Sequence, residues 1–187
     1  DGVRELNIVA QDTTYYGMDL YGEPRLAELI TELDSLVGID WVRLLYFYPM
    51  YISDELISAI AESGKVVPYI DMPLQHINDR MLKRMSRRVT RAKTEDMISR
   101  LREGIPGLAL RTTFITGFPG ETDDQFEELL DFIKETRFER VGVFTYSYEE
   151  HTPSSKFKDH IPEEVKLERQ QLLMEAQRQV VFDGNDS

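Results

Sequence analysis

The sequence predicts an α/β protein in which about five parallel strands alternate with covering helices. Three observations support this fold class. Short β-rich runs alternate with segments of helical periodicity, polar loops follow the runs, and 187 residues of which 41% are apolar can form a core. A closed eight-stranded barrel needs a longer chain. We therefore expect either a partial (β/α) barrel or an open, doubly wound sheet.

Apolar runs and capping signals predict the elements of the first half. A nearly continuous apolar run indicates a buried strand over 5–10. Apolar residues at helical spacing indicate a helix over 24–37, which a glycine stops. A second strand follows at 41–46. Ser53 is an N-cap candidate before two acidic residues, and it predicts a helix that reaches Gly64.

The alternation of strands and helices continues through the middle of the chain. The third strand, 66–70, contains Pro68, which cannot donate a hydrogen bond to a neighbouring strand. Helices at about 78–85 and 94–103 come next. A fourth strand, 108–115, follows them and is rich in threonine and apolar residues.

Two helix-start signals mark the last elements. A capping box at 122–125 opens a helix, and a fifth strand follows at 141–146. Pro162 stands where proline is favoured at the start of a helix, and this long helix reaches about Val181. We expect the tail, 183–187, to fray, because chain ends have few contacts.

Composition excludes several classes of function. The sequence has no cysteine, which excludes disulfides, thiolate metal ligands and cysteine nucleophiles within these residues. The formal net charge of −12 disfavours broad contact with nucleic acid, because lysines and arginines drive such binding. No stretch approaches the roughly 20 apolar residues of a membrane span, and no signal peptide opens the chain. We expect no membrane association and no strong direct nucleic-acid binding.

One short segment is strongly basic, while the rest of the chain is acidic. Such a segment is most often a solvated helix face. It could also contact an anionic partner or the carboxylate of a ligand. Its basic residues are Arg80, Lys83, Arg84, Arg87, Arg88, Arg91 and Lys93.

Polar loops follow the predicted strands at 11–17, 46–49, 71–76, 116–122 and 146–150. In parallel α/β folds, the carboxyl ends of the strands meet at one edge, where ligands bind. Five loops with amides, hydroxyls and aromatic rings therefore predict a pocket for a polar small molecule. Turns are polar for local reasons as well, which is the alternative explanation.

Single residues in these loops leave alternatives open. Gly117 and Gly120 allow close approach of a ligand or a plain strand-to-helix turn. Glu121 is an acid–base residue or, more simply, a carboxylate stabilised by a helix dipole. His76 could bind a ligand or be structural, and the histidines lack zinc-site spacing. Without a Walker loop, Gly-x-Ser-x-Gly or Gly-x-Gly-x-x-Gly, hydrolase and nucleoside-triphosphatase functions lack support.

Taken together, the loops resemble those of the radical S-adenosylmethionine (SAM) methylthiotransferases. The Gln-Asp-Thr-Thr and Pro-Leu-Gln-His forms are similar to the branch of that family that modifies a ribosomal protein, and differ from the tRNA-modifying branch. The resemblance spans nearly the whole chain. The motifs that carry it, in order, are Gln11-Asp12-Thr13-Thr14-x-Tyr16-Gly17, Pro73-Leu74-Gln75-His76, Met85-x-Arg87-Arg88 and Gly117-Phe118-Pro119-Gly120-Glu121-Thr122.

The resemblance implies a specific reaction and its cofactors. The family adds a methylthio group to the β-carbon of an aspartate in a small-subunit ribosomal protein. One SAM is cleaved reductively to a 5′-deoxyadenosyl radical, another supplies the methyl group, and two 4Fe–4S clusters take part. The implied partners are the ribosomal protein or the ribosome as substrate and an electron donor, and the implied location is cytoplasmic.

The resemblance also implies that this chain is only part of such an enzyme. Residues 1–182 match the central part of a radical SAM domain, short of its first strand and cluster loop. The N-terminal cluster domain and the C-terminal RNA-binding-type β-barrel lie outside the sequence. Without cysteines these residues cannot hold a cluster, so the isolated chain is expected to be inactive. The alternatives are a tRNA-modifying core and a non-enzymatic α/β scaffold that binds a nucleoside-like ligand or a partner.

Residue by residue, the resemblance implies a SAM site and assigns no catalytic residue. Gln11 and Thr13 take the place that binds the SAM amino group, and Gln75 lies where ribose contacts arise. Either Arg87 or Arg111 pairs with the SAM carboxylate. The residues implied to contact adenine are Thr113, Ile115 and Gly117 on the fourth strand, and Phe144 and Tyr146 on the fifth.

Overall fold

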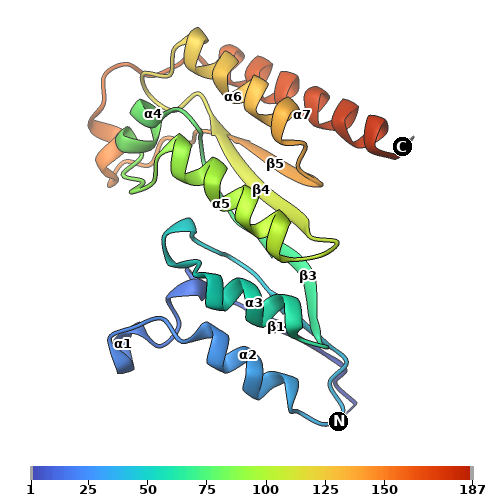
Figure 1. Ribbon diagram of the computed structural model, residues 1–187. Coiled ribbons are helices and arrows are strands. Elements are labelled where there is room, and N and C mark those ends of the chain that lie inside the picture. Colours follow the sequence, from blue (N-terminus) through green and yellow to red (C-terminus); the bar gives the residue numbers. More distant parts are fainter. Residues whose placement is uncertain (1, 186–187) are drawn as a thin grey trace. The chain divides into compact units, whose positions relative to one another are not determined.

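The structure is a computed structural model that describes residues 2–185, and its sheet has five parallel strands. The strands are β1 (Glu5–Ile8), β2 (Trp41–Leu44), β3 (Val66–Asp71), β4 (Ala109–Thr116) and β5 (Arg140–Thr145). They are hydrogen-bonded in chain order, β1-β2-β3-β4-β5 (Figure 1). A doubly wound sheet reverses its strand order at a switch point, whereas a (β/α) barrel keeps it. The partial barrel is therefore confirmed, and the doubly wound alternative is wrong.

Helices follow the strands as the sequence predicts, and short helical turns lie in the loops. The α-helices of the described residues are α1 (Met18–Tyr21), α2 (Leu26–Asp34), α3 (Asp54–Glu62), α4 (Asp79–Arg84), α5 (Arg91–Gly104), α6 (Asp123–Thr136) and α7 (Glu163–Asn185). The 3-10 helices are η1 (Thr13–Tyr15), η2 (Pro49–Tyr51) and η3 (Pro153–Lys156). No helix in the described part of the chain is long and apolar enough to cross a membrane.

The chain forms two compact units. Unit 1 comprises Asp1–Pro73 and Ala92–Arg111, and it holds β1, β2, β3 and the start of β4. Unit 2 comprises Leu74–Arg91 and Thr112–Ser187, and it holds the rest of β4, β5 and helices α4, α6 and α7. Each unit has its own apolar core.

In unit 1, α2 and α3 lie side by side (Figure 1) and bury their apolar stripes. Ile30 of α2 and Ile60 of α3 are almost fully buried, as are Val42 and Leu44 of β2. The N-cap predicted at Ser53 is confirmed, because its hydroxyl accepts a hydrogen bond from the Leu56 amide at 3.1 Å.

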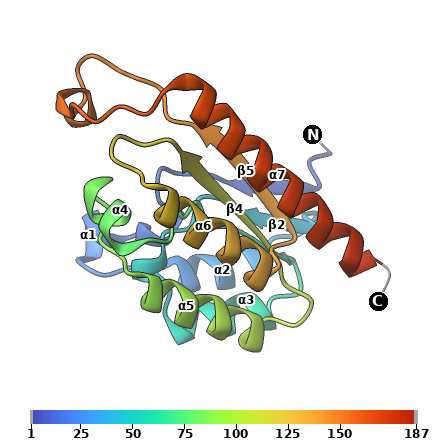
Figure 2. The same ribbon diagram turned by 90° about the horizontal axis from the view of Figure 1, so that it is seen from above.

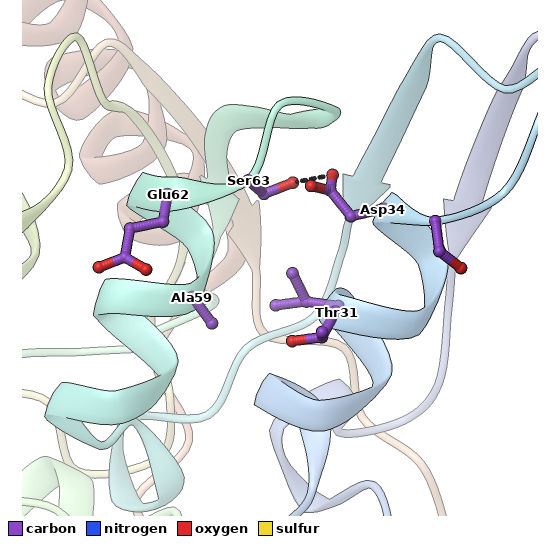
Figure 3. A pocket seen from close by; sticks show the side chains of 7 residues that line it. Thr31, Asp34, Ala59, Glu62 and Ser63 are labelled. Atoms are coloured by element: carbon purple, nitrogen blue, oxygen red, sulfur yellow. Dashed lines mark hydrogen bonds between the residues drawn. The ribbon is translucent and has the colours of Figure 1, made fainter.

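The carboxylate of Asp34 joins the end of α2 to the turn between α3 and β3 (Figure 3). It accepts hydrogen bonds from the Ser63 hydroxyl at 2.6 Å and from the Gly64 and Lys65 amides. The Ser63 hydrogen bond is the main cause that lowers the pKa of Asp34. A groove of about 420 Å³ lies between these helices, and none of the sequence-predicted site residues lines it. We regard the Asp34 cluster as a structural tie.

Pro68 sits where β3 departs from regular pairing. Val42 pairs with Val66 and Leu44 pairs with Ile70, so β3 bulges between these two pairs. Pro68 lies within this shifted stretch of β3, and a proline is tolerated in a strand where the regular ladder is interrupted. The predicted strand and its proline are compatible for this reason.

In unit 2, α7 packs along β5 and against α6, as Figure 2 shows. The capping box that starts α6 is confirmed at Thr122 and Gln125. Beneath α6, the rings of Phe114, Phe132 and Phe138 meet edge to face, with centroids 5.7 to 6.3 Å apart.

Several element boundaries differ from the sequence prediction for local reasons. Helix α2 is shorter than 24–37, and the single-turn α1 lies between Gly17 and Gly22, both with positive φ. Helix α5 begins at Arg91, whose amide donates to the carboxylate of Asp79 at 2.6 Å. Helix α7 continues to Asn185 rather than ending near 181. Of the predicted frayed tail, residues 186–187 lie outside the described residues.

Candidate cofactor-binding strand ends

Strand β4 separates a buried face from a half-exposed face. Along Ala109–Thr116 the burial alternates strictly, and Phe114 and its same-face neighbours are buried. The three predicted site residues Arg111, Thr113 and Ile115 share the other, half-exposed face. The sequence prediction thus selected residues of one strand face, and this face is accessible enough to contact a ligand.

Arg111 forms an ion pair with Asp71 within unit 1. Its Nη1 lies 2.7 Å from Oδ1 of Asp71, whose side chain is only 2% exposed, whereas the Arg111 side chain is 39% exposed. Burial lowers the pKa of Arg111, but the Asp71 hydrogen bond and charge outweigh it, and the net pKa is raised. Arg111 therefore stays charged, and its side chain is accessible enough for the guanidinium to bind a carboxylate.

The backbone of Gln75 is fixed beside β4 within unit 2. Its amide donates to the Thr113 carbonyl at 2.9 Å, and its carbonyl accepts from the Ile115 amide at 2.9 Å. Gln75 has φ of 73°, a left-handed conformation that is uncommon for residues other than glycine. Its side chain is half-buried. The structure therefore brings Gln75, Thr113 and Ile115 together within unit 2.

Protein side chains fill the space beside Gly117 and Gly120. Both have positive φ, and a Cβ at Gly117 would lie 2.2 Å from Cγ of Lys166. A Cβ at Gly120 would lie 2.5 Å from the carboxylate of Asp159. Of the two explanations left open by the sequence, these contacts favour packing within the turn, because the space beside each glycine holds protein atoms.

Glu121 is buried among polar side chains within unit 2. Its Oε1 accepts hydrogen bonds from the Gly117 amide at 3.1 Å and from Arg169 Nη1 at 2.6 Å. Its Oε2 lies 3.4 Å from Nε2 of His76. The groups that hold this carboxylate are therefore Arg169 and the Gly117 amide.

His76 is a structural histidine in this network. Its Nδ1 accepts hydrogen bonds from the Ile77 and Asn78 amides at 2.9 and 3.0 Å, which fixes the turn after Gln75. The side chain is fully buried. Of the two roles considered for His76, this geometry supports the structural one.

Arg169 is the residue of this site that sequence reasoning missed. It lies on α7, 48 residues from Glu121, and its side chain is 7% exposed. A buried arginine on a helix needs a partner, but the sequence does not indicate which of many carboxylates supplies it. The signal that could have indicated Arg169 is its position on the inward-facing side of a long helix.

The two aromatic residues predicted on the fifth strand lie in different environments. Phe144 is 59% exposed. Tyr146 is buried against Phe118, with ring centroids 5.1 Å apart, and its hydroxyl donates to Ser154 at 3.0 Å. Ile115 packs against this same cluster. The structure therefore offers Phe144, and not the Tyr146 ring, as a surface for stacking.

In the loop after β1, Thr13 is buried and Gln11 is exposed. The Thr13 hydroxyl donates to the Leu45 carbonyl, and its amide donates to the Tyr46 carbonyl at 3.0 Å. With its proton engaged, the Thr13 oxygen can only accept a hydrogen bond from a ligand, as an ammonium group would require.

The basic segment is partly used inside unit 2. Arg84 donates to the Pro119 carbonyl at 2.8 Å and pairs with Asp159. Arg91 pairs with Glu128 at 2.9 Å. Arg87, a candidate for the SAM carboxylate, is half-buried, and its amide donates to the Leu82 carbonyl. The segment is therefore more than a solvated helix face.

The chain's residues do not fit an iron–sulfur cluster. The sequence contains no cysteine, and among the described residues no group of three or more histidine, aspartate or glutamate side chains could hold a metal. Taken singly, Arg111 in unit 1 is half-exposed and suits the carboxylate of an organic ligand such as SAM. Gln75 in unit 2 is half-buried and has an amide that can donate and accept hydrogen bonds.

The fold and motifs together define a member of the radical SAM superfamily. The model of that superfamily matches residues 1–133, so the chain belongs to this family. Over 186 residues it is 55% identical to the ribosomal protein uS12 methylthiotransferase RimO of Caldanaerobacter subterraneus, and 53% identical to that of Geotalea uraniireducens. Both alignments cover 100% of this chain and 42% of the relative.

Solved structures show the same fold. Coproporphyrinogen III oxidase (HemN) from Escherichia coli, a radical SAM enzyme, matches with a TM-score of 0.74 at 18% identity, over 95% of this chain and 41% of that one. Methylornithine synthase (PylB) matches with a TM-score of 0.60 at 15% identity, over 94% and 48%. The family resemblance in the sequence is confirmed.

Proposed function

We propose that the protein containing this chain is a radical SAM methylthiotransferase that modifies the β-carbon of an aspartate in ribosomal protein uS12. The observation that carries this proposal is the 55% identity to a RimO protein across the full length of the chain. The chain spans about 42% of that relative, and three of its predicted SAM contacts, Arg111, Thr113 and Ile115, share the half-exposed face of β4. A cytoplasmic location follows from a ribosomal substrate.

SAM, when bound, would supply both the radical chemistry and the methyl group. We assign the carboxylate of SAM to Arg111, with Arg87 as the alternative, and the ribose to Gln75. Thr113 and Ile115 would contact the adenine, together with Phe144. Arg111 suits its role because its charge is retained and its side chain is 39% exposed.

The remaining predicted SAM contacts are residues of, or next to, the loops that follow the strands. Gln11 and the acceptor oxygen of Thr13 would receive the SAM ammonium group. Gly117 and Tyr146 are packed against other side chains, so we assign them a supporting role. Thiolates for the two clusters would come from segments outside this chain, and an electron donor would reduce them.

An assay of the full-length, cluster-loaded protein tests this function. It would be incubated anaerobically with SAM, a reductant and either uS12, ribosomes or tRNA, and products would be identified by mass spectrometry. We expect a methylthio group on one uS12 aspartate, with the isolated chain as an inactive control. Modification of tRNA alone would support the tRNA-modifying alternative. Absence of SAM cleavage and of both products would favour a non-enzymatic scaffold.

A further inference from the structure

A buried polar cluster connects α7 to the loop after β4 and to the turn after Gln75, all within unit 2. It consists of Arg169, Glu121 and His76, whose side chains are 7%, 0% and 0% exposed. Arg169 also pairs with Asp123 at 2.6 Å. The cluster's other outer contacts include backbone amides: Glu121 accepts from Gly117, and His76 accepts from Ile77 and Asn78. The cluster therefore holds the loop after β4 and the turn after Gln75.

We propose that Arg169 is a positioning residue that acts through Glu121 and the facing His76 to orient the SAM-contacting end of β4 and the turn at Gln75, all within unit 2. This inference rests on the proposed function. Arg169 places Glu121 through a contact of 2.6 Å, and Glu121 places the Gly117 amide. The facing His76 places the turn that directly follows Gln75, whose strained backbone is bonded to Thr113 and Ile115.

Stability alone is a weak reason for this cluster. Burying an ion pair carries a desolvation penalty that well-packed apolar side chains avoid, so such pairs often add little stability. The geometry supplies another reason, because a carboxylate and an imidazole fix the direction of backbone amides in a way that apolar side chains cannot. An orienting network is useful where a backbone must be held in an unfavourable conformation, as at Gln75.

A second contact from the same helix supports this role. Lys166 lies three residues before Arg169, and its Nζ donates to the Tyr146 carbonyl at 3.0 Å. Its side chain covers the space beside Gly117, where a Cβ would overlap it. One turn of α7 thus contacts the ends of both β4 and β5 through polar groups.

The test compares variants of the full-length, cluster-loaded protein. Arg169→Gln removes the charge, and Arg169→Lys keeps the charge but cannot form the planar fork of contacts with Glu121 and Asp123. Gln177→Ala is the matched control, because Gln177 is a buried residue of α7 whose side chain donates to the Phe138 carbonyl at 2.9 Å, outside the cluster. Thermal stability is measured for all three.

Two readouts separate positioning from general stability. The first is hydrogen exchange of the segment 113–121 in the protein without SAM, where Arg169→Gln should accelerate exchange about tenfold and Gln177→Ala should not. The second is SAM affinity, which Arg169→Gln should weaken at least about fivefold, a coupling of the usual size between linked sites. Arg169→Lys should restore part of both.

Four outcomes are informative. Equal effects of Arg169→Gln and Gln177→Ala on exchange and affinity would overturn the proposal, as would no effect of Arg169→Gln on either. If Arg169→Gln does not fold, the same comparison is made with Arg169→Lys. Failure of the unaltered protein to bind SAM would refute the proposed function, whereas the exchange readout would still test the link from Arg169 to Gly117.

Discussion

Each of the two units contains a buried carboxylate that pairs with an arginine. The two pairs differ in how exposed the arginine is. In unit 1, Asp71 is buried but Arg111 is 39% exposed. In unit 2, Glu121 is 0% exposed and Arg169 is 7% exposed. The first pair leaves part of its guanidinium available to a ligand, whereas the second is enclosed by protein.

This difference teaches how similar pairs serve different purposes. A half-exposed arginine held by a buried carboxylate is oriented and still able to make new contacts. A buried arginine cannot contact a ligand directly. It can affect ligand binding only through the residues that it contacts. We therefore assign binding to Arg111 and positioning to Arg169.

The largest expected effect tests this contrast directly. Glu121→Gln leaves the Arg169 charge buried without its main partner, and should lower the free energy of unfolding by about 3–5 kcal/mol. Asp71→Asn leaves Arg111 able to reach solvent, and should cost about 1.5 kcal/mol. Chemical denaturation of the full-length variants measures both. Equal losses would show that exposure of the arginine does not distinguish the two pairs.

Two glycines with similar φ angles allow a second comparison, between a residue with open space beside it and a residue covered by a side chain. Gly107, in the turn before β4, has open space beside it, whereas Gly117 is covered by the Lys166 side chain. Gly107→Ala should cost only the left-handed strain, about 1–2 kcal/mol, while Gly117→Ala adds overpacking of about 1–3 kcal/mol. Thermal denaturation measures the difference.

A double-mutant cycle provides the control for that difference. If the Lys166 stem causes the extra loss, Gly117→Ala should cost less in a Lys166→Ala background. The cost in that background should approach that of Gly107→Ala. A cost that does not change would mean that backbone strain, rather than the lysine contact, dominates at Gly117.

Local signals made much of the fold predictable. The cap at Ser53 and the box at Thr122 and Gln125 each act within one helical turn, so the sequence identifies where α3 and α6 begin. The start of α5 was misplaced because its amide partner, Asp79, lies 12 residues upstream and belongs to another helix. Contacts of this kind leave no periodic signal in the sequence.

The candidate site was predictable only in part, for the same reason. Alternation along β4 places Arg111, Thr113 and Ile115 on one face, which the strand period alone implies. The pairing of Glu121 with Arg169 depends on how α7 packs, and no sequence pattern specifies it. The environment of Tyr146 likewise depends on the loop that carries Ser154.

A substitution at Gln75 tests whether its side chain binds SAM, in addition to the role of its backbone in the fold. Gln75→Leu keeps similar bulk and leaves the backbone bonds to β4 in place, but it removes the amide from the ribose. A hydroxyl left buried and unpaired costs about 1–3 kcal/mol, which corresponds to about 5- to 150-fold weaker SAM binding. Calorimetry and 5′-deoxyadenosine formation in the full-length protein measure it. A lower melting temperature with unchanged binding would assign Gln75 to the fold alone.

The smallest expected effect concerns a third pair, Glu128 with Arg91, of intermediate exposure at 28% and 32%. Burial raises the pKa of Glu128, but hydrogen bonds from Asn78 and Arg91 outweigh it, and the net pKa lies below the ordinary 4.5. A lowered pKa stabilises the fold above pH 4.5, and this contribution is lost as the pH falls through the folded-state pKa. Glu128→Gln should therefore cost about 1 kcal/mol at pH 7 and progressively less below pH 4.5.

Denaturation curves between pH 7 and 3 measure that gap, with the exposed neighbour Glu127→Gln as the control. Because Glu128 is less buried than Glu121, its removal should cost less than Glu121→Gln at every pH. The gap between the unaltered protein and Glu128→Gln should close on acidification, since protonated Glu128 no longer pairs with Arg91. A gap that persists unchanged to pH 3 would mean that packing, rather than charge, joins α6 to the start of α5. The exposure of a pair would then fail to predict its contribution in this fold.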